Sequence, residues 1–167
     1  MANHIWLRGM DCAVSNGEMA VLLTALGLSG SRLAGTEEER RLIVWLMEHD
    51  QSVLGLGAVG FSLSELPWER ERLAEGQDFL LRTIGGARAH LGWESLDYRP
   101  DRARLEGWLD CLEAMVTALS PEDIQDGAAA AWLAAAEPGD PVRNNFPKCP
   151  QHGIYLTAFG CLACNDA

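Results

Sequence analysis

With 167 residues, of which 48% are hydrophobic and 22% charged, the chain has the length and composition of one globular domain. A chain of this size can bury a sizeable core, which excludes a disordered protein and a mini-protein that folds only around a metal. Its formal net charge of −11 repels phosphate backbones and favours cationic partners.

The charge is unevenly distributed along the chain. Residues 141–167 carry Arg143, Lys148 and Asp166 and therefore a net charge of +1, which leaves −12 for residues 1–140. We therefore divide the chain into an acidic helical body, residues 1–140, and a nearly neutral tail, residues 141–167, that is packed on or linked to the body. The acidity belongs to the body.

The beginning of the chain does not resemble a targeting segment, because Arg8, Asp11 and Glu18 interrupt any basic-then-apolar leader. No apolar stretch approaches the length that a membrane span needs. Five cysteines without an export signal favour a reducing compartment. We expect a cytoplasmic protein that does not enter a membrane.

Two helix-start patterns lie in the first third of the chain. Ser15 with Glu18, and Thr36 with Glu39, have the spacing of capping boxes. The first helix is predicted to end at Gly27 or Gly30. The run 42–47 is wholly apolar, which favours a buried helix and leaves a buried strand as the alternative. Before these helices, residues 5–7 form either a short strand or a docking segment.

Further helices are predicted downstream of a glycine-rich loop at residues 52–67. One runs from about Pro67 to Leu91 and is kinked or ended by Gly85-Gly86. A second, over 100–119, has apolar residues at every third or fourth position, and a third follows Ser120-Pro121 through an alanine-rich segment. The predicted fold is mainly α: an antiparallel bundle of four or five helices with a small C-terminal zinc-knuckle or ribbon-like element.

The most informative pattern lies at the end of the chain. Cys149 and His152 are separated by two residues, as are Cys161 and Cys164. Thiolate and imidazole are the ligands that zinc prefers, and this spacing lets one tight turn direct two of them at the same ion. These four residues predict a structural Cys3His zinc site, because four protein ligands leave no position for a catalytic water. The alternative is four unliganded side chains on an unstructured end.

The two ligand pairs resemble the knuckles of zinc-ribbon and treble-clef modules, with His152 at a position where a second cysteine is usual. This resemblance covers only the tail and implies a structural zinc ion held between two turns.

Catalytic candidates in the body are weak. His4, His49 and His90 have no ligand partner in sequence, although the three could converge in space to hold a catalytic metal. Cys111 is predicted to fill space in the core, and Cys12 is predicted to be a free thiol without an adjacent base. No residue is assigned a catalytic role.

Three functions remain open. The first is a non-enzymatic, zinc-stabilised interaction module, for example an inhibitor or immunity-type protein, whose acidic body docks the basic surface of another protein. The second is nucleic-acid binding or regulation through the zinc tail. The tail has only two cations for phosphate contacts, Arg143 and Lys148, so this function has less support. The third is an enzyme with an unrecognised site in the helical body. The oligomeric state is not indicated.

Overall fold

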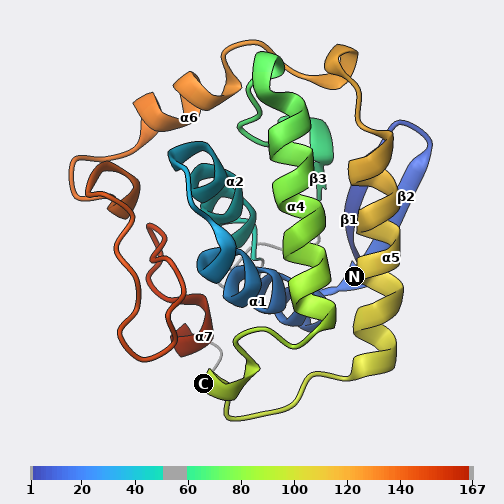
Figure 1. Cartoon of the computed structure of the whole chain (residues 1–167), viewed down its shortest axis with the longest axis vertical. Helices are drawn as coiled ribbons and strands as arrows, with labels where there is room; N and C mark the ends of the chain where they lie inside the picture. Colours follow the sequence, from blue (N-terminus) through green and yellow to red (C-terminus); the bar gives the residue numbers. More distant parts are fainter. Residues whose placement is uncertain (1, 51–59, 166–167) are drawn as a thin grey trace.

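The computed structural model describes residues 2–50 and 60–165, and over these residues the chain is mainly helical, as predicted (Figure 1). Within the described ranges there are six α-helices and a small sheet of three strands. In chain order the elements are β1 (Ala2–Leu7), β2 (Met10–Ser15), α1 (Asn16–Leu33), α2 (Glu37–Met47), β3 (Phe61–Ser62), α4 (Leu73–Arg88), α5 (Arg102–Ala118), α6 (Ala128–Ala135) and α7 (Leu162–Asn165).

Helix α1 is buried along most of its length and forms the centre of the molecule. It begins at the predicted capping box of Ser15 and Glu18, but the predicted stop at Gly27 or Gly30 is wrong, because the helix continues to Leu33. A Cβ added at Gly30 would lie 2.6 Å from the side chain of Ile43. A Cβ added at Gly27 would lie 2.5 Å from the side chain of Met47. The two glycines therefore let α2 approach the C-terminal half of α1 closely, and the resulting contact outweighs their low helix propensity.

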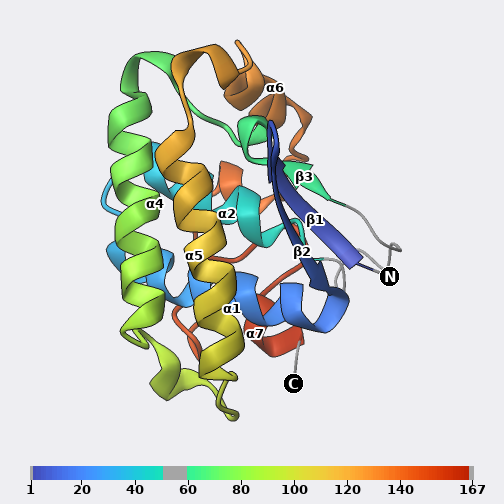
Figure 2. The ribbon, with the colours of Figure 1, turned by 90° about the vertical axis from the view of Figure 1, so that its right-hand side faces the viewer.

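Helices α2 and α4 pack on α1. The run 42–47 is helical and buried in α2, so the strand alternative for it was wrong. Helix α4 continues through Gly85 and Gly86 to Arg88 instead of ending there. A Cβ at Gly86 would collide with the Ser29 hydroxyl of α1, which explains a glycine at that point of the α1–α4 interface. Figures 1 and 2 show α5 lying alongside α4.

The N-terminal segment forms strands, which decides between the two alternatives for residues 5–7. Strands β1 and β2 form an antiparallel hairpin, and β3 pairs in parallel with β1 through Ile5 and Phe61. The inward face carries Ile5, Leu7, Cys12 and Val14, as the two-residue period of a strand requires.

Strand β2 is joined to α5 by a disulfide between Cys12 and Cys111. The prediction that Cys12 is a free thiol is therefore wrong, and Cys111 is more than a space-filling side chain. Sequence reasoning treated the two cysteines separately because they are 99 residues apart. Strand alternation turns Cys12 toward the core, where α5 presents Cys111.

The alanine-rich segment begins its helix later than predicted. Pro121–Asp123 form a short 3-10 turn, and α6 starts only after Gly127, which has a φ of 77°. Trp132 of α6 donates a hydrogen bond to Glu48 at the end of α2 (3.2 Å). Residues 52–59 of the predicted glycine-rich loop lie outside the described residues. Among the described helices, none is long and apolar enough to cross a membrane.

Candidate metal centre

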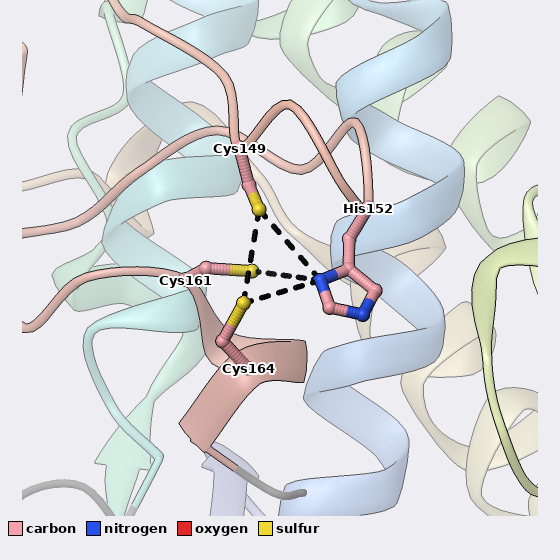
Figure 3. Close-up of side chains that lie close together, drawn as sticks. All are labelled: Cys149, His152, Cys161 and Cys164. Atoms are coloured by element: carbon pink, nitrogen blue, oxygen red, sulfur yellow. Dashed lines mark hydrogen bonds between the residues drawn. The ribbon is translucent and has the colours of Figure 1, made fainter.

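The four predicted ligand residues lie together at the C-terminal end of the chain. Figure 3 shows the side chains of Cys149, His152, Cys161 and Cys164 pointing toward one another, and their ligand atoms all lie within 4.8 Å of each other. The first three side chains are buried and Cys164 is exposed. Within residues 2–50 and 60–165, no other group of three or more His, Cys, Asp or Glu side chains has this arrangement.

The distances between these atoms match the edges of a small tetrahedron. The Sγ atoms of Cys149 and Cys164 are 3.8 Å apart, and His152 Nδ1 lies 3.3 to 3.7 Å from the three sulfurs. A tetrahedral zinc ion with ordinary bond lengths would separate two sulfurs by about 3.8 Å and a sulfur and a nitrogen by about 3.5 Å. The cluster is therefore compatible with a metal ion at its centre.

A tight turn brings the first pair of residues together. The N–H of Gly153 donates to the carbonyl of Cys149 (2.8 Å), and the N–H of Cys149 donates to the carbonyl of Ile154 (2.8 Å). Gly153 has a φ of 70°, a conformation that residues with a Cβ rarely adopt. The turn places Cys149 and His152 on the same side of the backbone.

The second pair lies at the beginning of a short helix rather than in a second turn. Cys161 directly precedes α7 and Cys164 lies within it, so one helical turn brings their side chains to the same side. Two isolated antiparallel bridges flank the first pair and join the segment that follows it: Lys148 pairs with Tyr155, and Thr157 pairs with Gly160.

The metal segment, residues 148–165, is anchored on α1 and on the 3-10 turn Trp93–Ser95. Ile154 is fully buried, and the N–H of Tyr155 donates to the hydroxyl of Ser31 (3.0 Å). The hydroxyl of Ser95 donates to the carbonyl of His152 (3.4 Å). Sequence reasoning missed both serines, because their partners are 124 and 57 residues away and a single serine carries no signal for such a contact.

The electrostatics of the thiols favour a cation among them. Burial opposes ionisation of Cys149, but hydrogen bonds from the backbone N–H and the ring of His152, and from the N–H of Gln151, outweigh it and lower the pKa of this thiol. Burial raises the pKa of Cys161, and the neighbouring Cys149 sulfur adds to the effect. Without a cation, the sulfurs cannot all carry negative charge at such short separations. A bound metal removes this conflict.

The three histidines of the body do not converge. His4 lies on β1 and contacts Asp11 (2.9 Å), and His49 stacks on Trp45 at the end of α2 (3.7 Å between ring centroids). His90 stacks on Trp93 after α4 (3.8 Å). Each imidazole has its own neighbour on a different element, so the described residues offer no three-histidine metal site.

The chain matches no protein-family model, no curated protein and no solved structure. Its function is therefore inferred from its own side chains and their arrangement.

Proposed function

We propose that the C-terminal cluster binds one structural zinc ion and that the tail is a zinc knuckle. The separations of the sulfur and nitrogen atoms support this assignment, as does the set of three thiolates and one imidazole, which suits zinc better than magnesium or calcium. Four protein ligands complete a tetrahedral shell, so the ion stabilises the tail and activates no water. We also propose that the helical body forms an antiparallel bundle and that this bundle carries the binding surface.

We further propose that the protein is a non-enzymatic interaction module that docks a basic partner through an acidic groove. This groove has a volume of about 420 Å³ and lies between the beginning of α2 and the first half of α4. Five carboxylates and two guanidinium groups line it: Glu38, Glu39, Glu69, Glu75, Asp78, Arg72 and Arg82. The excess of carboxylates in this one groove is the observation that carries the proposal.

The walls of the groove suit a lysine or arginine side chain. Leu42 and Trp68 are buried beneath it and give an apolar surface for an aliphatic stem. The carboxylates of Glu75 and Asp78 are mostly exposed and are paired only with Arg72 and Arg82 of neighbouring turns. Exposed pairs of this kind are weak, so an incoming cation can compete for the carboxylates. The −12 charge of the body would also accelerate the encounter with a basic protein.

Variants in which carboxylates are replaced by neutral amides test this docking proposal. The double variant Glu75→Gln/Asp78→Asn removes two groove charges while keeping the shape of both side chains. The matched control is Glu137→Gln/Asp97→Asn, which makes the same charge change at exposed carboxylates without an ion pair in the described structure. We expect the groove variant to bind an oligolysine peptide about tenfold more weakly than the control at low salt, and to lose basic proteins that co-purify with the wild type. Equal binding by the two variants would reject the groove as the docking site.

The proposed compartment is the cytoplasm, because three metal-binding thiols must stay reduced. The free thiols of the C-terminal cluster provide the test. If thiols are alkylated in denaturant at the moment of cell lysis, we expect Cys149, Cys161 and Cys164 to be alkylated throughout the population and the disulfide between Cys12 and Cys111 to stay closed. Disulfides that involve Cys149, Cys161 or Cys164 would instead place the protein in an oxidising compartment.

A further inference from the structure

The positive charges of this acidic chain are mostly neutralised within the molecule. Of the thirteen arginine and lysine residues, eight make ion pairs with carboxylates of the described residues. The five that make no such pair are Arg40, Arg99, Arg102, Arg143 and Lys148. Three of these five line a single cleft, although they come from α2 and from two separate positions in the tail. This cleft therefore presents three cations without a carboxylate partner among the described residues, in a molecule whose net charge is −11.

The three cations are held in place by neutral groups. Arg40 donates from Nε to the hydroxyl of Tyr155 (3.3 Å), and the Lys148 ammonium lies over the ring of Tyr155, 5.0 Å from its centroid. Arg143 donates to the carbonyls of Leu133 and Ala134 at the end of α6 (3.1 and 3.3 Å). These contacts orient the cations without cancelling their charge.

The one carboxylate in the cleft wall is already paired. Glu37 contacts Arg41, which lies outside the cleft, at 3.0 Å. The electrostatic character of the cleft is therefore set by Arg40, Arg143 and Lys148. Its volume is about 1150 Å³, enough to admit a small organic ligand.

We propose that this basic cleft binds a small phosphorylated molecule that carries an apolar or aromatic group, such as a nucleoside diphosphate. Guanidinium groups match phosphate oxygens with two parallel hydrogen bonds, and an ammonium group adds a compact positive charge. The apolar side chains of Leu133, Val142 and Phe146 line the same cleft and offer contacts to the organic part of the ligand. This site is separate from the acidic groove and does not depend on the proposed docking function.

The surroundings of the cleft select a compact anion over a polymer. The body carries −12, so a nucleic acid strand that extended beyond the three cations would meet a repulsive surface. The metal segment also contributes to the cleft, since Lys148 and Tyr155 pair across the turn that carries Cys149 and His152. Metal binding thus positions two of the residues that would contact the ligand.

Calorimetric titration of the full-length, zinc-loaded protein tests the proposal, with inorganic pyrophosphate and adenosine diphosphate as probes. We expect saturable binding of both, tighter for the nucleotide. Arg40→Gln and Arg143→Gln should each weaken it about tenfold. The matched controls are Arg99→Gln and Arg102→Gln, which remove the other two unpaired cations outside this cleft and should change the affinity by less than about twofold. Circular dichroism and zinc content verify that each variant is folded and loaded.

Several outcomes would overturn the assignment. One is no binding of either probe up to about 10 mM. Another is an equal loss of affinity in the Arg99 and Arg102 controls, which would mean that only the overall charge matters. Citrate that binds as tightly as pyrophosphate would reject phosphate as the recognised group. A single-stranded oligonucleotide that binds more tightly than the nucleotide, with the same dependence on Arg40 and Arg143, would reject a compact ligand.

Discussion

The helical body and the C-terminal tail hold their shapes by different means. In the body, α1 is surrounded by α2, α4, α5 and the sheet (Figures 1 and 2). Apolar side chains such as Leu23, Ile43 and Phe79 are fully buried there. Within the described part of the tail, residues 144–165 have one α-helix, the four-residue α7, and otherwise turns and isolated bridges. The first region draws its stability from buried area, whereas the second depends on a few directed contacts around four ligand atoms. The two regions should therefore respond differently to the same perturbation.

The largest difference is expected when the proposed zinc ion is removed. Cys161→Ser deletes one thiolate of the cluster, and we expect it to weaken zinc binding by at least about a hundredfold, because structural sites owe their affinity to a complete set of ligands. The tail should then become susceptible to proteolysis, while the helical circular dichroism of the body is retained. Cys164→Ser should have the same effect. Loss of most of the helical signal on chelation would contradict the separation of the two regions.

The body should instead be sensitive to crowding of its core. At Gly30 an added Cβ would lie 2.6 Å from Ile43, so Gly30→Ala is expected to lower the free energy of unfolding by about 1–3 kcal/mol. The matched control is Gly85→Ala in α4, where an added Cβ meets nothing within 4 Å and where the higher helix propensity of alanine should stabilise by up to about 1 kcal/mol. Urea denaturation measures both changes. Zinc affinity should be the same in the two variants.

A smaller effect is expected at the contact between the two regions. Ser31→Ala removes the acceptor for the buried N–H of Tyr155, and an unsatisfied buried donor costs about 1–3 kcal/mol. This cost should appear as faster zinc loss to a chelator and faster hydrogen exchange at Tyr155. Ser29→Ala is the control, because the Ser29 hydroxyl contacts only the body, donating to the carbonyl of Thr83 (2.7 Å). If Ser29→Ala accelerated zinc loss equally, the tail would not be anchored through Ser31.

The smallest effect concerns pH and is confined to the body. Burial lowers the pKa of His49, although the hydrogen bond to the carbonyl of Trp45 opposes this shift. Since its folded pKa lies below the unfolded value of about 6.5, the unfolded chain takes up a proton first, and stability is lost as the pH falls below that value. His49→Asn, whose amide can still donate to Trp45, should flatten this dependence. Urea midpoints measured from pH 7.5 to 5 in variant and wild type give the difference, and parallel curves would contradict the assignment.

The sequence predicted those features that local patterns determine. The capping boxes at Ser15 and Thr36 are present, and so is the long helix α5, because caps and apolar periodicity act within a few residues. The four tail residues come together as their spacing predicted. The identity of a zinc ion among them stays a prediction.

The features that sequence reasoning missed depend on contacts between distant segments. Gly30 has the pattern of a helix stop, yet it is a contact point for Ile43, a residue of the next helix. Cys12 and Cys111 have no local pattern that links them, and the pairing of β1 with β3 joins segments more than fifty residues apart. The basic cleft could not be predicted from the sequence either, because Arg40 and Lys148 line the same cleft only when the tail packs against α2.

X-ray absorption spectroscopy at the zinc edge, on protein purified without added metal, tests the central claim most directly. The predicted result is one zinc ion per chain with three sulfur ligands at about 2.3 Å and one nitrogen ligand at about 2.0 Å, and Cys161→Ser should lose one sulfur or the metal. Protein that is folded and monodisperse but free of zinc, or a zinc ion coordinated only by oxygen and nitrogen, would contradict the claim that Cys149, His152, Cys161 and Cys164 form one metal site.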